Sequence, residues 1–313
     1  MMGNFFQTGV IVSIFSAGIR LATPYLLASI GEMFDQRSGV YNLGIEGIML
    51  IGAFVGFYAA LKTGSLILGV LMAVLVGLLM GLLSAFINVT MKAEQGISGI
   101  GIYMFGFGLS GLLFRLTMGA IVSINGFNPI AIPLLHRIPF IGEILFNQNW
   151  MVYFAFLLVP TSYIILFKTT FGLKIRSVGE NPSAADSLGV SVDKIRYICI
   201  IVGSILAALA GAFLTIGQQK AIFVENISAG RGFIAIALVY FGRWQPTGVM
   251  VGSLLFSILD ALQIRLQIVN IGIPYEYAVM APYIITIFVL IFVTQKRIGG
   301  PTALGKPFKT EES

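Results

Sequence analysis

Eight apolar stretches divide this sequence, and each is long enough to cross the hydrocarbon core of a membrane, which takes about 20 helical residues. They cover residues 9–30, 43–61, 64–90, 96–114, 150–167, 197–217, 246–266 and 276–293. A ninth stretch, 231–242, is too short for a full crossing, so we expect a half-span or re-entrant helix packed among the others. Backbone polar groups in lipid must be bonded internally. The sequence therefore predicts an all-α polytopic membrane protein with eight or nine transmembrane helices, some of them discontinuous.

The composition agrees with this class and excludes others. Of 313 residues, 57% are hydrophobic and 10% charged, which is more apolar than a soluble domain of this size. The 37 glycines are expected where helices pack closely in lipid. Lys and Arg (19) exceed Asp and Glu (13), but they are dispersed among loops without a basic stripe, so no nucleic-acid partner is expected. We expect one transmembrane domain over residues 1–313.

The longest polar interval, 168–196, predicts the orientation of the spans. Lys and Arg beside membrane spans mark the cytoplasmic side, and five of them occur in this interval: Lys168, Lys174, Arg176, Lys194 and Arg196. If successive loops on either side of this interval alternate between the two faces of the membrane, further basic residues lie inside: Arg37, Lys92, Arg243, Lys296, Arg297, Lys306 and Lys309. Fewer fall outside: Lys62, Arg115, Arg137, Lys220 and Arg231. The predicted N-terminus is therefore external, and the tail 294–313 is cytoplasmic.

A short helix is encoded within this polar interval. Asn181 suits an N-cap, Pro182 the first helical position, and Gly189 the left-handed residue after the helix end. Ala184, Ala185 and Leu188 would share one face and present a shallow apolar surface outward. Two interpretations remain open: a solvated connector, or a docking helix for a cytoplasmic partner.

Glycines also concentrate in residues 39–53, where they alternate with Asn42 and Glu46. This pattern suits a discontinuous helix whose freed backbone groups face a cavity, with Gly44 and its neighbours on the translocation pathway. Close helix packing through glycine is the alternative interpretation.

Three segments together resemble a known family. They are GLKIRSVGENPSAADSLGV at 172–190, GVYNLGIEGIMLIGA at 39–53 and GRGFIAIALVYFGRWQPTG at 230–248. Taken in chain order, they resemble the permease subunits of ABC importers for simple sugars and nucleosides. The stretch ATPYLLASIGE at 22–32 is closer to the nucleoside permeases than to the ribose permeases.

The resemblance implies that the interval 168–196 is the loop that couples to an ABC ATPase. Its matching residues are Gly172, Arg176, Gly179, Glu180, Asn181, Pro182, Ala184, Ala185, Leu188 and Gly189. The implied partners are that ATPase, a second permease chain in a homo- or heterodimer, an extracellular substrate-binding protein and a small-molecule substrate, with nucleosides favoured. The chain itself would bind no cofactor, and ATP and Mg²⁺ would be bound by the ATPase.

Ionisable groups within the apolar runs require partners, because an unpaired charge in the membrane is costly. Arg20 lies inside the first span and Glu46 at the start of the second, while Glu32 falls in the predicted turn between them. The simplest expectation pairs Arg20 with Glu46 or Glu32 as a structural clasp. A direct role in the pathway and a position in a water-filled vestibule are the alternatives.

The sequence supports no catalysis. It contains no G-x-x-x-x-G-K-[ST] phosphate loop, no catalytic Ser/His/Asp set and one histidine, which excludes a multi-histidine metal site. Two other functions remain open: an ion-coupled secondary transporter that uses Glu46, and a membrane scaffold without transport.

Overall fold

The computed structural model describes residues 8–133, 135–269, 280, 284 and 299–308. Its helices are α1 (Thr8–Arg37), α2 (Ile45–Thr63), α3 (Leu66–Ala85), α4 (Gln95–Thr117), α5 (Ile141–Leu145), α6 (Trp150–Lys168), α7 (Thr170–Glu180), α8 (Pro182–Ser187), α9 (Val192–Ile216), α10 (Arg231–Phe241) and α11 (Pro246–Val269). The π-helical turn η2 (Phe86–Thr90) extends α3, and the 3-10 turn η3 (Leu135–Arg137) precedes α5. The short strands are β1 (Ser123–Asn125), β2 (Ile130–Ala131), β3 (Asn147–Gln148) and β4 (Lys220–Ile222).

Seven helices of the described residues are long and apolar enough to cross a membrane, and α10 is a shorter apolar helix. The predicted all-α membrane fold is confirmed, and the predicted half-span 231–242 is α10. The eighth predicted span, 276–293, lies outside the described residues except for two positions. The first span was predicted to end at residue 30, but α1 continues to Arg37 and so includes Glu32 and Asp35.

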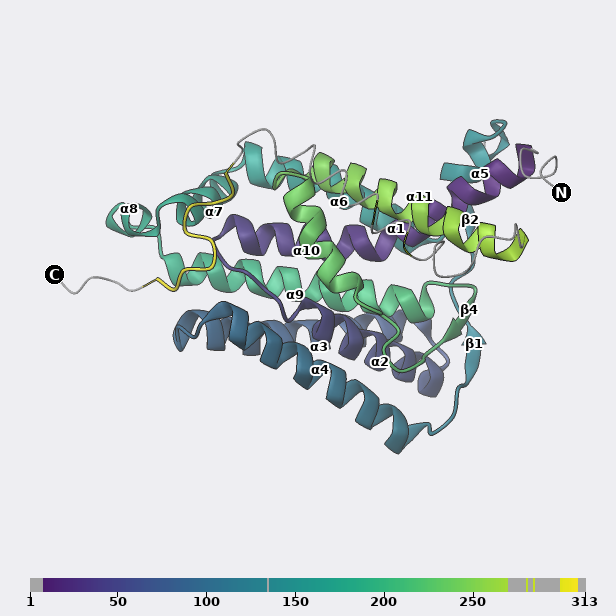
Figure 1. The fold of residues 1–313 in the computed structure, drawn as a ribbon, viewed down its shortest axis with the longest axis horizontal. Helices are drawn as coiled ribbons and strands as arrows, with labels where there is room; N and C mark the ends of the chain where they lie inside the picture. The colour runs from purple at the N-terminus through teal and green to yellow at the C-terminus, as the bar shows by residue number, and fades with distance from the viewer. Residues whose placement is uncertain (1–7, 134, 270–279, 281–283, 285–298, 309–313) are drawn as a thin grey trace.

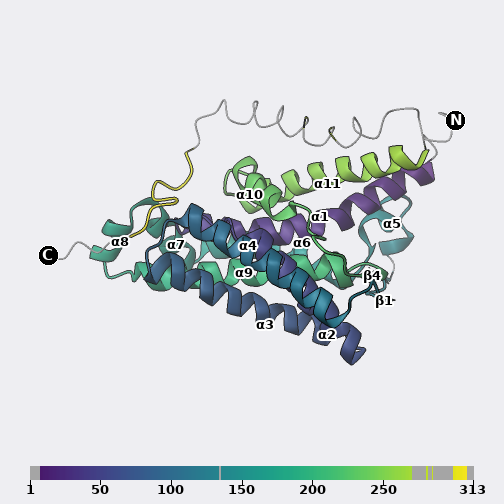
Figure 2. The ribbon, with the colours of Figure 1, turned by 60° about the horizontal axis from the view of Figure 1, so that its bottom comes forward.

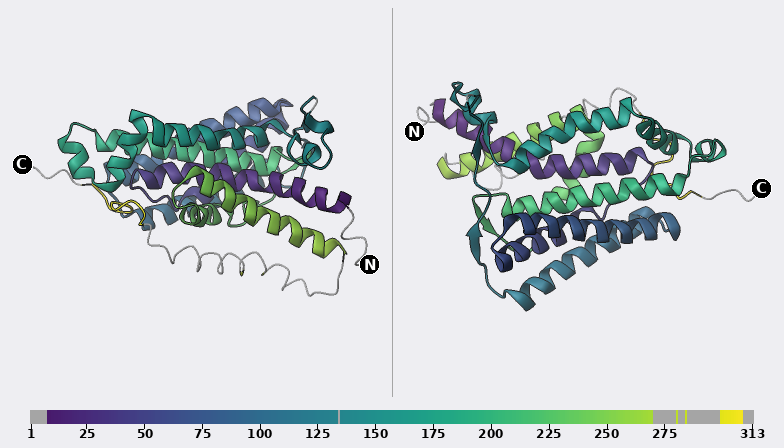
Figure 3. Two further views of the ribbon diagram at one scale, coloured as in Figure 1. Left: turned by 90° about the horizontal axis from the view of Figure 1, so that it is seen from above. Right: turned by 180° about the vertical axis from the view of Figure 1, so that it is seen from behind.

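Helix α9 forms the centre of the bundle and packs against α1, α2 and α3 (Figure 3). Small residues permit this close packing. A Cβ atom added to Gly211 of α9 would collide with the backbone carbonyl of Met49 in α2, and one added to Gly31 of α1 would lie 2.7 Å from the Gly203 oxygen of α9. The core therefore depends on direct backbone approach, as expected for helices in lipid.

The two ends of the bundle differ (Figure 1). At one end lie α7, α8 and the described C-terminal residues 299–308. At the other end lie α5 and two antiparallel strand pairs, β1 with β4 and β2 with β3. Helix α4 lies on the outside of the bundle against α2 (Figure 2).

The close contact of α9 with α2 gives a first prediction. Gly211→Ala should destabilise the protein by about 2 kcal/mol, because its Cβ has no space against the Met49 carbonyl. Gly108→Ala in α4 is the matched control, since nothing lies within 4 Å of an added Cβ there. Thermal melting in detergent should show a lower Tm for the first variant alone; equal Tm values would contradict this packing.

Candidate functional site

Glu46, in the first turn of α2, binds the N-terminus of α10 from across the bundle. Its Oε1 accepts hydrogen bonds from Ser228 Oγ (2.5 Å) and the Gly230 amide (2.7 Å), and its Oε2 accepts one from the Gly232 amide (2.6 Å). The side chain is 1% exposed. The first amides of a helix lack internal partners and carry a partial positive charge, so a carboxylate is well suited to this position.

The glycines before α10 are explained by this contact. Gly230 has a φ of +85°, which most side chains resist. A Cβ atom on Gly232 would lie 2.7 Å from both the Cα and an Oε atom of Glu46. The sequence Gly-Arg-Gly at 230–232 therefore admits the carboxylate to the helix end.

The C-terminal end of α10 is attached to the last turn of α1. The indole Nε1 of Trp244 donates a hydrogen bond to Gln36 Oε1 (2.7 Å). Arg37 donates to the Trp244 carbonyl from Nε (2.9 Å) and from Nη2 (2.7 Å). Trp244 is 6% exposed, so these bonds anchor it in the interior of the protein. Both ends of α10 are thus fixed by the α1–α2 region.

Asn42 lies at the centre of the buried, non-helical segment 38–44 between α1 and α2. Its backbone amide donates to Glu32 Oε1 and its side-chain amide to Asp35 Oδ2, both at 3.3 Å. Its Oδ1 accepts the Gly44 amide at 3.1 Å. Residues 38–44 connect α1 to α2, and α2 is continuous from Ile45 to Thr63, so the predicted discontinuous helix over 39–53 is not present. Gly47 and Gly52 instead lie against backbone atoms of α4 and α9, as the close-packing interpretation expected.

Arg20 does not belong to this network, and its predicted pairing with Glu46 or Glu32 is wrong. Its Nη1 donates to Ser16 Oγ at 3.2 Å, one turn earlier in α1, and the side chain lines a cavity near the β-strands. Glu46 binds the residues before α10, and Glu32 binds Gln36 and Asn42. The pairing fails because both carboxylates already accept hydrogen bonds from other groups, which for Glu46 are distant in sequence and for Glu32 are local.

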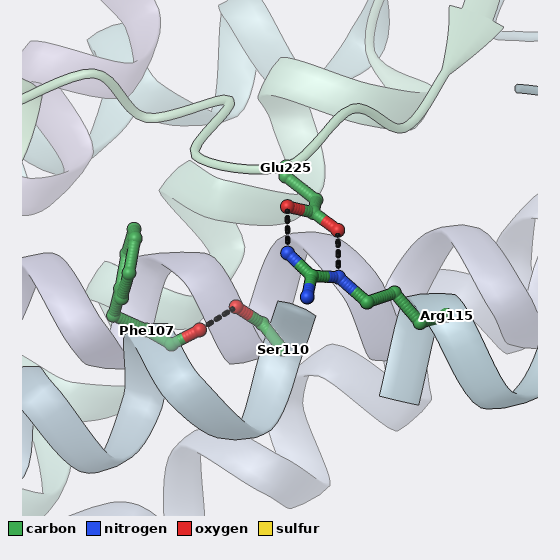
Figure 4. A network of polar contacts seen from close by, with 4 residues as sticks. All are labelled: Phe107, Ser110, Arg115 and Glu225. Atoms are coloured by element: carbon green, nitrogen blue, oxygen red, sulfur yellow. Dashed lines mark hydrogen bonds and ion pairs between the residues drawn. The ribbon is translucent and has the colours of Figure 1, made fainter. Parts of the chain in front are cut away.

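An ion pair joins α4 to the segment that leads into α10 (Figure 4). Arg115 Nε and Nη2 bind the two carboxylate oxygens of Glu225 at 2.7 and 2.9 Å. Hydrogen bonding to Arg115 holds the pKa of the Glu225 carboxyl below its ordinary value. Both side chains are solvent-accessible, so this pair orients the segment more than it stabilises the fold.

At the opposite end, α8 has the caps expected from its sequence. Asn181 Oδ1 accepts the Ala184 amide at 3.0 Å, Pro182 is the first helical residue, and Gly189 has a φ of +79°. The predicted outward face is only partly correct. Leu188 is 84% exposed, but Ala185 is 3% exposed and packs into the core.

The residues before α8 form a second helix, α7, which the sequence did not separate from the loop. Gly172 and Gly179 lie so close to the carbonyls of Ile165 and Arg37 that a Cβ would collide with them. The Arg176 guanidinium lies 5.2 Å from the centre of the Phe167 ring. These contacts hold α7 against α6 and the end of α1.

The described C-terminal residues lie over this end of the bundle. The Ala303 amide donates to the Gly179 carbonyl (2.9 Å), and the Thr302 hydroxyl donates to Glu180 Oε2 (2.9 Å). The Gly305 amide donates to the Gly39 carbonyl at 3.2 Å. This segment therefore links α7 directly to the 38–44 segment.

Arg196 also belongs to this linkage. It was expected among the cytoplasmic loop cations, but it is 1% exposed at the start of α9. Its guanidinium donates to the carbonyls of Ser38 and Lys306, both at 3.2 Å.

Comparison with known proteins agrees with this architecture. Residues 14–290 match the family model of the permease component of the branched-chain amino acid transport system. The chain belongs to this permease family. It is therefore a multi-pass transport subunit of the cell membrane, not an enzyme.

Relatives cover nearly the whole permease. A guanosine ABC transporter permease protein of Bacillus subtilis is 36% identical over 92% of this chain and 93% of its own. A nucleoside ABC transporter permease protein of Lactococcus lactis is 36% identical over 88% and 90%. A provisionally named glucose ABC transporter permease protein of Haloferax volcanii is 35% identical over 95% and 97%. No solved structure is significantly similar to the permease.

Sequence reasoning missed Ser228 as a partner of Glu46, and it missed Gln36 and Trp244 as polar partners at the end of α1. The spacing of Gln36 was a usable signal, because it follows Glu32 by one helical turn. In the structure its Nε2 donates to Glu32 Oε1 at 2.8 Å. Nothing local predicts that Trp244 and Ser228 bind residues of α1 and α2.

The Glu46 contact gives a second prediction. Glu46→Gln should destabilise the permease by about 1–3 kcal/mol and impair transport, because one acceptor becomes a donor facing backbone amides. Glu94→Gln is the matched control. Glu94 also accepts two backbone amides at a helix start, which lowers the pKa of its carboxyl, but it is solvent-exposed. Melting temperatures and uptake should fall for Glu46→Gln far more than for Glu94→Gln; equal effects would contradict the buried cap.

Proposed function

We propose that this permease forms the translocation pathway of an ATP-driven nucleoside importer and that α8 is its contact with the ABC ATPase. The observation that carries this proposal is the exposure of Leu188. This side chain is 84% exposed at the C-cap of α8, a helix whose N-terminus is capped by Asn181. A large apolar side chain presented in this way suits a partner groove. Family membership supports the same partner, with ATP and Mg²⁺ bound by the ATPase.

Charge distribution supports a cytoplasmic position for α8. The interval around it carries Lys168, Lys174, Arg176 and Lys194. The turn at Lys92 and the C-terminal residue Lys306 belong to the same end, because Tyr41, Gln95 and Gly305 line one cavity there. By the positive-inside rule this end faces the cytoplasm, and α5 and the β-strands face outside.

The contacts at this end suggest how ATPase movement reaches the membrane interior. A displacement of α8 moves α7, which is bonded through residues 302–305 to the 38–44 segment. That segment leads into α2, whose Glu46 holds α10. The short helix α10, held at its N-terminus by Glu46, can move as one unit between two packed positions.

Nucleosides are the proposed substrate class. Two of the relatives described above are named for guanosine or nucleosides, and one is named for glucose. The stretch 22–32 favours nucleosides. The proposed assembly contains a second permease chain, two ATPase subunits and an external substrate-binding protein. An ion-coupled transporter that uses Glu46 is less well supported, because both carboxylate oxygens already accept hydrogen bonds.

Substitution of Leu188 tests the proposed contact. Leu188→Glu should leave membrane abundance and Tm unchanged, since an exposed substitution changes stability by no more than about 0.5 kcal/mol. ATPase copurification in mild detergent and ATP-dependent guanosine uptake should both be lost. Ala185→Trp is a poor test, because Ala185 is buried and its enlargement would disturb the fold.

Ile141→Glu is the control for ATPase copurification. Ile141 is 53% exposed in α5, at the opposite end of the molecule. Retention of the ATPase by Leu188→Glu would disprove the role of α8. Guanosine uptake that survives ATP depletion but stops with an uncoupler would instead favour ion coupling.

A further inference from the structure

A polar cavity of about 570 Å³ lies at the end of the permease opposite α8. Four parts of the chain line it: the first half of α1, the loop between β1 and β2, the segment from α5 to the start of α6, and the residues from the end of α9 to the start of β4. Its size falls within the range of about 300–1,000 Å³ that is usual for small-molecule sites. With α8 in the cytoplasm, this cavity is on the external side.

Arg20 enters this cavity from α1, within the membrane-spanning part of that helix. Its one hydrogen bond within the described part of the chain is to Ser16, which uses one of its five N–H groups. An arginine inside a span is costly unless it faces a partner or a water-filled cavity, and such residues mark substrate pathways. Four donors of Arg20 are therefore left for a ligand or for water.

The other walls provide neutral polar groups. Asn147 and Gln218 line the cavity with carboxamides, which can both donate and accept hydrogen bonds. Gln148 closes one side and is held in place by bonds from its Nε2 to Ser16 Oγ (3.1 Å) and the Ile144 carbonyl (2.8 Å). The ring of Phe127, which packs edge-to-face on Trp150 at 5.4 Å, adds an apolar surface.

The charges of the cavity disfavour a strongly ionic ligand. Arg20 and Lys220 are offset in part by Glu143, so the lining carries a small net positive charge among many neutral groups. Several carboxamides, one aromatic ring and one guanidinium suit a neutral molecule with many hydroxyl or carbonyl oxygens.

We infer that this cavity is an external binding site for the transported nucleoside, with Arg20 donating hydrogen bonds to its oxygen atoms. This inference rests on the proposed function and on the orientation given above. Of the roles left open for Arg20 by the sequence, it selects a direct one in the pathway, as a group that binds the substrate.

Uptake and binding measured with guanosine test this site in the complete transporter. Arg20→Gln should raise the KM for uptake by about tenfold or more, the usual loss for one charged hydrogen bond, and weaken guanosine binding to the purified permease in parallel. Arg20→Lys should fall between it and the wild type, because it keeps the charge with fewer donors. Gln218→Trp should abolish binding by filling the cavity from its loop wall.

Arg115→Gln is the matched control, because it removes an arginine at the end of α4 that is paired with Glu225 outside the cavity. Its guanosine binding should equal that of the wild type. Tm and membrane abundance identify any variant that fails to fold. Only the guanosine binding of variants that fold is compared with that of the wild type. Wild-type binding by both Arg20→Gln and Gln218→Trp would overturn the inference, and so would displacement of guanosine by inorganic phosphate.

The inference can fail separately from the proposed substrate. If the wild-type transporter takes up glucose but not guanosine, the nucleoside assignment is wrong. The same variants measured with glucose then decide whether the cavity binds the substrate: a raised KM for Arg20→Gln supports it, and an unchanged KM overturns it.

Discussion

The carboxylate of Glu46 is the interaction on which the interior of this permease depends. A half-length helix buried in a membrane protein exposes amides that neither lipid nor its own backbone can satisfy. Glu46 binds two of these amides and the Ser228 hydroxyl, and in return its own charge is stabilised away from water. Because Glu46 lies in the first turn of α2, the point at which the chain re-enters the bundle after α1 determines the position of α10.

The re-entry segment 38–44 connects the residues that bind α7 with the start of α2. On one side it is bonded through Gly39 to the C-terminal residues that also bind α7. On the other side it leads through Asn42 and Gly44 to Glu46. The cavity around Arg20, which we propose to be external, is lined in part by the opposite half of α1. One long helix thus contributes both to the proposed substrate site and to the end that would respond to the ATPase.

The sequence by itself determined the features that depend on local chemistry. The lengths of the apolar runs fixed the membrane class and the short helix α10, since crossing the hydrocarbon requires a minimum length. Asn181, Pro182 and Gly189 fixed α8, because caps act within a few residues. Clustered glycines around Glu46 left two interpretations open, and the structure shows close helix packing, with Gly47 against α4 and Gly52 against α9.

Only the tertiary structure decided which polar groups meet. Glu46 and Ser228 are 182 residues apart, and Trp244 and Gln36 are 208 apart, so no local pattern relates them. The same reason explains why Arg20 lines a cavity and does not pair with Glu46, why Ala185 faces inward, and why Arg196 is buried beneath Lys306. Burying a polar group is favourable only with a bonded partner, and the folded chain as a whole determines which partner is within reach.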